Sequence, residues 1–163
     1  ACIFRLSTVY APVIEGATPN FVGYYADAIN KGEKIRLPGR GRPRRDLLYV
    51  DDLSSACEAF SDSVVRNGTY NLGGGPQNAM SLNELVAKME SVSGLQALVD
   101  EDRPLPLPVP ANYVSDLRLC EYELGWKPAI DVESGLARLF IHGAGTQTAE
   151  RFAGSNDRSP IAD

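Results

Sequence analysis

Hydrophobic residues along this chain alternate between short continuous runs and stretches in which they recur every three or four positions. The short runs predict β-strands, and the spaced stretches predict helices. Strands are predicted at residues 1–6, 34–37, 69–72 and 97–99, and one more begins at Arg44 and Arg45. Helices are predicted at residues 19–31, 52–66, 82–93, 117–124 and 132–140. This succession predicts an α/β fold, and the apolar run at residues 1–6 is typical of a parallel sheet.

Most of the predicted helices begin at a residue that can cap them. Thr18 precedes a proline at the first helical position, and Asp51 and Asp131 are suited to the same role. Ser81–Glu84 has the pattern of a capping box. The expected helix ends are at Gly32, Asn67–Gly68, Gly94 and Gly125. The neighbouring acids Asp51 and Asp52 could bind a metal, but capping and the helix dipole explain them more simply.

The apolar run at residues 1–6 is expected to be a buried strand with a neighbouring strand on each side. The sequence begins directly in this run, at Ala1 and without a methionine. We therefore expect preceding chain, or another chain, to supply one of the neighbours. Residues 7–10 follow the strand at its carboxyl end, which is where ligands bind in open α/β sheets.

Composition narrows the class of protein. A length of 163 residues favours one domain, and the net charge of -5 argues against general nucleic-acid binding. No apolar run approaches the roughly 20 residues that cross a membrane. Cys2, Cys57 and Cys120 form no CxxC pair, which indicates a reducing, cytoplasmic compartment. His142 is the only histidine, so a His-rich metal site is excluded and no metal is expected.

Basic residues gather in one stretch of this otherwise acidic chain. Seven of the 16 lysines and arginines lie between Lys31 and Arg45, where Glu33 is the only acid. Guanidinium groups gathered in a loop suit a di-anion, because each can bind phosphate oxygens in a bidentate manner. A solvated basic surface would have the same composition, and Arg40 and Arg42 are expected to be exposed.

Residues 45–52 read Arg-Asp-Leu-Leu-Tyr-Val-Asp-Asp and resemble a segment of the extended short-chain dehydrogenase/reductases, the family of NAD-dependent nucleotide-sugar epimerases and dehydratases. Four other segments resemble this family in the same order, at residues 5–12, 70–74, 81–85 and 124–128. The resemblance extends over residues 1–141. It implies an α/β subdomain that binds a nucleotide-diphosphate sugar and has strands that would complete a Rossmann-type parallel sheet.

The resemblance assigns three polar residues to the substrate. Arg45 matches the arginine that binds the diphosphate, although it could instead pair with Asp46 or a helix end. Thr8 stands where relatives often have an asparagine that touches the substrate, and it keeps a hydroxyl but not the amide. Asn71 would point at the nucleotide end of the substrate, although its amide could instead stabilise a turn.

Three further assignments are less direct. In relatives the backbone of the strand that matches Ile35 and Leu37 lies against the nucleotide base. Arg103 is displaced from a second diphosphate-binding arginine, and it could reach the ligand if the proline-rich segment 103–110 loops out. That segment is otherwise expected to be a stiff surface connector or, alternatively, an SH3-type ligand. Gly73–Gly75 would let the backbone pass close to the ligand.

The sequence also lacks two patterns that the resemblance implies. Relatives bind NAD through a Gly-rich turn and use a Tyr-x-x-x-Lys pair, and neither is present here. We therefore expect no catalytic residue. Residues 1–142 would be the substrate-binding C-terminal domain of an enzyme whose NAD(P)-binding N-terminal half is absent, and residues 143–163 would be a disordered tail.

Under this interpretation NAD(P) belongs to the parent enzyme and does not bind tightly to this chain alone. Two alternatives remain open. The chain could be a stand-alone binding module that has lost catalysis, or an interaction domain that completes the sheet of another chain. The apolar strand at residues 1–6 favours association in every case, including association into a homo-oligomer.

Overall fold

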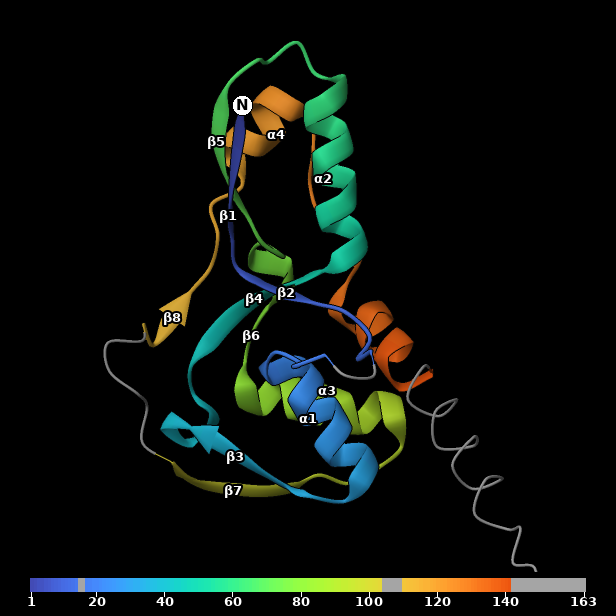
Figure 1. Ribbon diagram of the computed structural model, residues 1–163. Helices are drawn as coiled ribbons and strands as arrows, with labels where there is room; N and C mark the ends of the chain where they lie inside the picture. Colours follow the sequence, from blue (N-terminus) through green and yellow to red (C-terminus); the bar gives the residue numbers. More distant parts are fainter. Residues whose placement is uncertain (15–16, 104–109, 142–163) are drawn as a thin grey trace, which may run out of the picture.

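The computed structural model describes residues 1–14, 17–103 and 110–141, and β4 (Arg44–Tyr49) crosses the middle of the molecule (Figure 1). One group of elements contains β1 (Cys2–Leu6), α2 (Val50–Asp62), β5 (Gly68–Leu72) and α4 (Arg118–Leu124). A second group contains α1 (Phe21–Lys31), β3 (Lys34–Pro38), α3 (Leu82–Ser93) and β7 (Leu98–Arg103). The short elements are β2 (Thr8–Tyr10), η1 (Gly39–Gly41), η2 (Pro76–Asn78), β6 (Ala79–Ser81) and β8 (Asn112–Tyr113), and residues 132–141 form a further helix.

The predicted α/β fold with parallel strands is confirmed. β1 runs parallel to β5, β3 to β7, and β4 to both β2 and β8. The antiparallel partner of β4 is β6, a short strand that the hydrophobic pattern did not indicate. The predictions for residues 104–109, His142 and residues 143–163 lie outside the described residues.

Two hydrophobic clusters lie on opposite sides of β4. Successive side chains of a strand point to opposite faces, so Leu47 and Tyr49 enter the larger cluster and Leu48 enters the smaller one. The larger cluster is built mainly from α1, β3, α3 and the helix at residues 132–141. Buried members of the smaller cluster also include Ala56, Tyr70, Leu72, Cys120 and Trp126.

β1 forms at the predicted residues, and the described chain buries only part of it. Cys2 and Phe4 pack against the smaller cluster, whereas Ile3 and Leu6 are 60% and 47% exposed. Among the described residues β5 is the only strand that pairs with β1. One face of this two-stranded sheet and the unpaired edge of β1 are therefore bare in the described structure, which explains the exposure.

Two helix starts differ from the prediction. Asn20, not Thr18, caps α1, because its side-chain oxygen accepts hydrogen bonds from the backbone N–H groups of Val22 and Gly23 at 3.0 and 3.2 Å. The chain enters α2 directly from β4, so Tyr49 is the N-cap and Asp51 lies inside the first turn. Acids in a first turn still interact favourably with the helix dipole.

The two acids of α2 have separate structural partners. Asp52 is buried and accepts hydrogen bonds from the backbone N–H groups of Ala129 and Ile130 at 3.1 and 3.0 Å. Asp51 forms an ion pair with Arg138 at 2.7 Å. Both acids thus connect the C-terminal helix and the residues before it to α2. α2 itself ends earlier than expected, at Asp62.

The remaining helix-end predictions are confirmed. Ser81 and Glu84 form the capping box, and Asp131 accepts a hydrogen bond from the Ser134 N–H at 2.7 Å. The residues that follow α1, α3 and α4 are left-handed glycines: Gly32, Gly94 and Gly125. Trp126 is buried and donates to Ser55 Oγ at 2.9 Å, as a structural tryptophan would.

Tyr70 makes the stability of the smaller cluster sensitive to alkaline pH. Its hydroxyl donates to Glu123 at 2.6 Å, and this bond together with burial raises the pKa of Tyr70 to about 12. A raised pKa stabilises the folded state below the ordinary tyrosine pKa of about 10, and this contribution is lost as the pH rises through the folded value. Urea unfolding between about pH 9 and pH 12 should therefore show a loss of stability. Tyr70→Phe should be less stable at pH 9 and should have a flatter profile, and an unchanged profile would contradict this role.

Candidate functional site

A buried carboxylate joins four segments of the chain. Asp46 of β4 is fully buried, and its side chain accepts hydrogen bonds from Ser7 Oγ at 2.5 Å, Gly75 N at 3.2 Å and Ser115 N at 3.1 Å. Several donors are needed because a buried charge without partners is very costly. The donors come from the β1–β2 junction, the loop after β5 and the segment after β8. We call Ser7, Asp46, Gly75 and Ser115 the Asp46 junction.

The glycines after β5 allow this junction to close. A Cβ atom on Gly73 would lie 2.1 Å from Asp46 Oδ2, and one on Gly74 would lie 2.0 Å from the carbonyl oxygen of Leu47. Any side chain at either position would collide with β4. The glycine backbone thus passes close to another group, as predicted. In the described structure that group is β4, whereas the prediction named a ligand.

Three of the predicted substrate residues lie next to the Asp46 junction in the chain. Thr8 follows Ser7 and pairs with Leu47, Arg45 precedes Asp46, and Asn71 lies in β5 two positions before Gly73. All three are partly exposed. The fold therefore brings the backbones of these three residues close to the buried carboxylate of Asp46.

The structural partners proposed for Arg45 are wrong. Among the described residues its guanidinium group bonds neither Asp46 nor a helix end, and it donates to three backbone carbonyl oxygens. Nη1 lies 2.6 Å from the carbonyl oxygen of Arg44 and 3.3 Å from that of Ala111, and Nη2 lies 2.8 Å from that of Pro110. Consecutive residues of a strand face opposite sides, which is why Asp46 turns inward and Arg45 does not.

The other three predicted residues lie in the β3–β7 sheet. The side chains of Ile35 and Leu37 are 0% and 1% exposed and belong to the larger cluster, so only their backbone could meet a ligand. Arg103 is the last residue of β7 and pairs with Pro38. The position of its side chain lies outside the described structure. No described hydrogen bond connects these three residues to the Asp46 junction.

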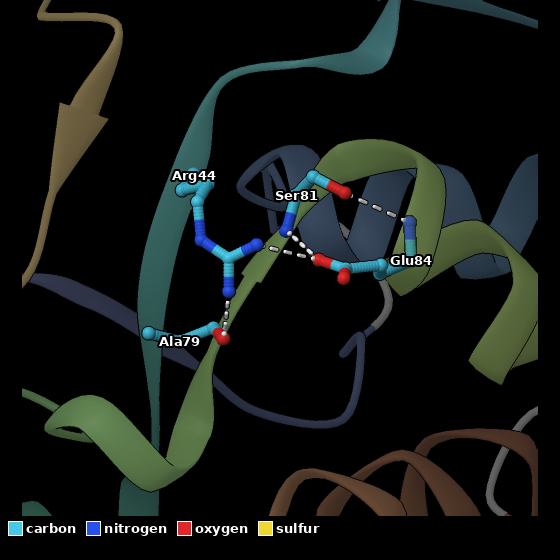
Figure 2. A network of polar contacts seen from close by, with 4 residues as sticks. All are labelled: Arg44, Ala79, Ser81 and Glu84. Atoms are coloured by element: carbon cyan, nitrogen blue, oxygen red, sulfur yellow. Dashed lines mark hydrogen bonds and ion pairs between the residues drawn. The ribbon is translucent and has the colours of Figure 1, made fainter.

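Arg44, the neighbour of Arg45, has a structural role (Figure 2). Its guanidinium group donates to Glu84 at 3.0 Å and to the carbonyl oxygen of Ala79 at 2.8 Å, and Glu84 also accepts from Ser81 N at 2.6 Å. The bonds from Ser81, helped by Arg44, hold the pKa of Glu84 below its usual value. Arg44 therefore ties β4 to the start of α3. Arg40 and Arg42 are exposed, as predicted.

The site residues that were not predicted from the sequence are Ser7, Asp46 and Ser115. Asp46 carried a usable signal, because it is an acid at the start of the apolar run Leu47–Val50. Ser115 carried none, although it is only 4% exposed and its hydroxyl has no partner in the described part of the chain. Within residues 1–14, 17–103 and 110–141 there is no group of three potential metal ligands. None of the helices there is long and apolar enough to cross a membrane.

Residues 1–73 match the family described as NAD dependent epimerase/dehydratase family, which confirms the resemblance found in the sequence. This stretch of the chain is an epimerase/dehydratase sequence. Its relatives include GDP-L-fucose synthase 1 of Arabidopsis thaliana, 26% identical over 72% of this chain and 35% of the relative. A probable UDP-glucuronate 4-epimerase of Rhizobium meliloti is 31% identical over 83% of this chain and 44% of the relative. The chain thus spans less than half the length of either of these epimerase/dehydratase relatives.

The fold is similar to that of solved epimerase/dehydratase structures. MoeE5 in complex with UDP-glucose and NAD superposes with a TM-score of 0.79 over 90% of this chain and 48% of the MoeE5 chain, at 24% identity. At this identity the likeness concerns the fold alone.

Proposed function

We propose that this chain is the nucleotide-sugar-binding, C-terminal part of an NAD-dependent epimerase or dehydratase. The observation that carries the proposal is the gathering of Thr8, Arg45 and Asn71 around the Asp46 junction. Thr8 and Asn71 lie at or beside the carboxyl ends of the parallel strands β1 and β5, where ligands bind in open α/β sheets. Arg45 lies near the start of β4, next to Asp46, which is bonded to Ser7 after β1. Arg45 supplies the positive charge that a diphosphate requires, and Thr8 and Asn71 supply a hydroxyl and an amide.

Catalysis is assigned to another part of the enzyme. An NAD(P)-binding turn needs glycines that leave room for a phosphate group. The glycine run at residues 73–75 does not fit this role, because Gly73 and Gly74 are packed against β4. The Tyr-x-x-x-Lys pair is absent from the sequence as well. Residues 1–142 would thus form a substrate-binding domain that is inactive by itself.

The bare side of β1 supports this division. Parallel sheets are usually covered on both faces, yet Ile3 and Leu6 are exposed and β5 is the only described partner of β1. An NAD-binding N-terminal half would complete the sheet. The same surface supports the alternative function, a non-catalytic module that associates with another chain or with a second copy of itself.

Arg45→Ala is expected to weaken nucleotide-sugar binding by about tenfold or more, since hydrogen bonds to charged groups contribute roughly 1.5–3 kcal/mol each. The measurement is titration calorimetry with UDP-, GDP-, CDP- and dTDP-sugars. Arg42→Ala is the matched control, because Arg42 belongs to the same basic stretch and is exposed. The control should bind like the parent chain.

Two results would contradict the proposal. Turnover of a nucleotide-sugar by this chain with NAD alone would show that catalysis does not lie elsewhere. Equal affinities of the Arg45→Ala and Arg42→Ala variants would remove Arg45 from the site. Association without any nucleotide-sugar binding would favour the interaction module.

A further inference from the structure

The contacts of Arg45 leave part of its guanidinium group available. An arginine side chain has five N–H donors. Two on Nη1 are directed to the carbonyl oxygens of Arg44 and Ala111, and one on Nη2 is directed to that of Pro110. Nε–H and the second Nη2–H have no partner among the described residues. These two nitrogens lie on one edge of the guanidinium plane, the geometry that binds a phosphate or carboxylate in a bidentate manner.

The segment that holds Arg45 is itself fastened to β4. Arg44 N donates to the carbonyl oxygen of Ala111 at 2.9 Å, and Tyr113 pairs with Arg45 in the β4–β8 ladder. Further along, Ser115 N donates to the buried carboxylate of Asp46 at 3.1 Å. Ala111, Tyr113 and Ser115 thus contact Arg44, Arg45 and Asp46, three successive residues of β4. The carbonyl oxygen of Ala111 is therefore held in place by Arg44 N, and that of Pro110 belongs to the residue next to it.

We propose that the carbonyl oxygens of Pro110 and Ala111 position the Arg45 guanidinium group so that its Nε edge faces a phosphate group of the ligand. This proposal rests on the proposed function, since it concerns the same site. The carbonyl oxygens fix the guanidinium plane before binding, so that less side-chain freedom is lost when the phosphate arrives. Pro110 and Ala111 are positioning residues that act through their backbone.

The arrangement also explains why a lysine would be a poor replacement for Arg45. One ammonium group could satisfy the carbonyl oxygens or the phosphate, but it lacks a second, oppositely directed set of donors. Arg45 can use one edge for the protein and the other for the ligand. Arg45→Lys is therefore expected to lose most of the affinity that Arg45→Ala loses, although the charge is kept.

The test is a double-mutant cycle on phosphate-dependent binding. Pro110→Gly keeps the carbonyl oxygen but frees the backbone that holds it. With UDP, GDP, CDP and dTDP as probes, Pro110→Gly should raise the Kd of the tightest binder about threefold to tenfold, the size expected for freeing one ordered side chain. In the Arg45→Ala background the same substitution should leave the Kd unchanged. Pro19→Gly, at a partly buried proline before α1 and outside this contact, is the control and should bind like the parent.

The outcomes separate this proposal from the proposed function. If Arg45→Ala weakens binding but Pro110→Gly does not, the site stands and the positioning role is wrong. If Pro110→Gly weakens binding equally with and without Arg45, its effect is structural and the positioning role is also wrong. Full affinity in Arg45→Lys would independently overturn it. If the parent chain binds none of the four diphosphates, both proposals fail.

Discussion

Asp46→Ala is expected to lower the free energy of unfolding by about 2–6 kcal/mol, because it leaves two buried backbone donors without an acceptor. The substitution removes the acceptor for Ser7 Oγ, Gly75 N and Ser115 N. Each backbone donor would then be left unsatisfied in the interior, at a cost of about 1–3 kcal/mol. Because the free energy of unfolding of small domains is only about 5–15 kcal/mol, this single change should remove a large part of it.

Urea unfolding followed by the fluorescence of Trp126 measures the effect of Asp46→Ala, since the chain has one tryptophan and it is buried. Asp116→Ala is the matched control. Asp116 is paired with Arg118 at 2.5 Å, and this contact lowers the pKa of Asp116 to about 2, yet both side chains are exposed. Exposed pairs contribute little to stability, so the control should unfold close to the parent midpoint. Equal midpoints for the two variants would refute the structural role of Asp46.

Gly74→Ala is expected to lower the free energy of unfolding by about 3 kcal/mol or more, at the upper end of the usual cost of overpacking. The added Cβ would lie 2.0 Å from the carbonyl oxygen of Leu47 and 2.6 Å from Cβ of Asn78. The first neighbour is backbone, so relief would require movement of β4. That strand pairs with β2, β6 and β8, and movement would disturb all three pairings.

Gly94→Ala separates close packing from conformational strain. Gly94 has a φ of 69°, but a Cβ there would meet nothing within 4 Å. Its substitution should cost about 1–2 kcal/mol, the penalty for a left-handed residue with a side chain. Denaturant unfolding of the two variants should therefore rank Gly74→Ala as the more destabilised. The reverse order would show that the contact with Leu47 is easily relieved.

Features that depend on local sequence were predictable in this chain. The capping box at Ser81 and Glu84 and the left-handed glycines each involve residues a few positions apart, so the pattern determines them. Thr18 failed as a cap because Asn20 competes with it, and Asn20 also donates to the carbonyl oxygen of Val9. Competition of this kind depends on tertiary contacts that the local pattern does not contain.

The candidate site was predictable only as far as the family motifs extend. These motifs led to Thr8, Arg45 and Asn71, which the fold places beside the Asp46 junction. The junction itself could not be predicted, because the donors to Asp46 are 29 to 69 residues distant in the chain. Two of the three carbonyl partners of Arg45, those of Pro110 and Ala111, are 65 and 66 residues distant and belong to the backbone, which leaves no side-chain signature.

The alternation of side chains along β4 has a consequence for how the molecule comes apart. Leu47 and Tyr49 pack into the larger cluster and Leu48 packs into the smaller one, so β4 is a single strand shared by both hydrophobic clusters. If β4 detaches from one cluster, apolar side chains of the other cluster also become exposed to water. We therefore expect unfolding to be cooperative across both halves of the molecule. Damage near α4 would be felt around α1, although these helices lie at opposite ends of the structure (Figure 1).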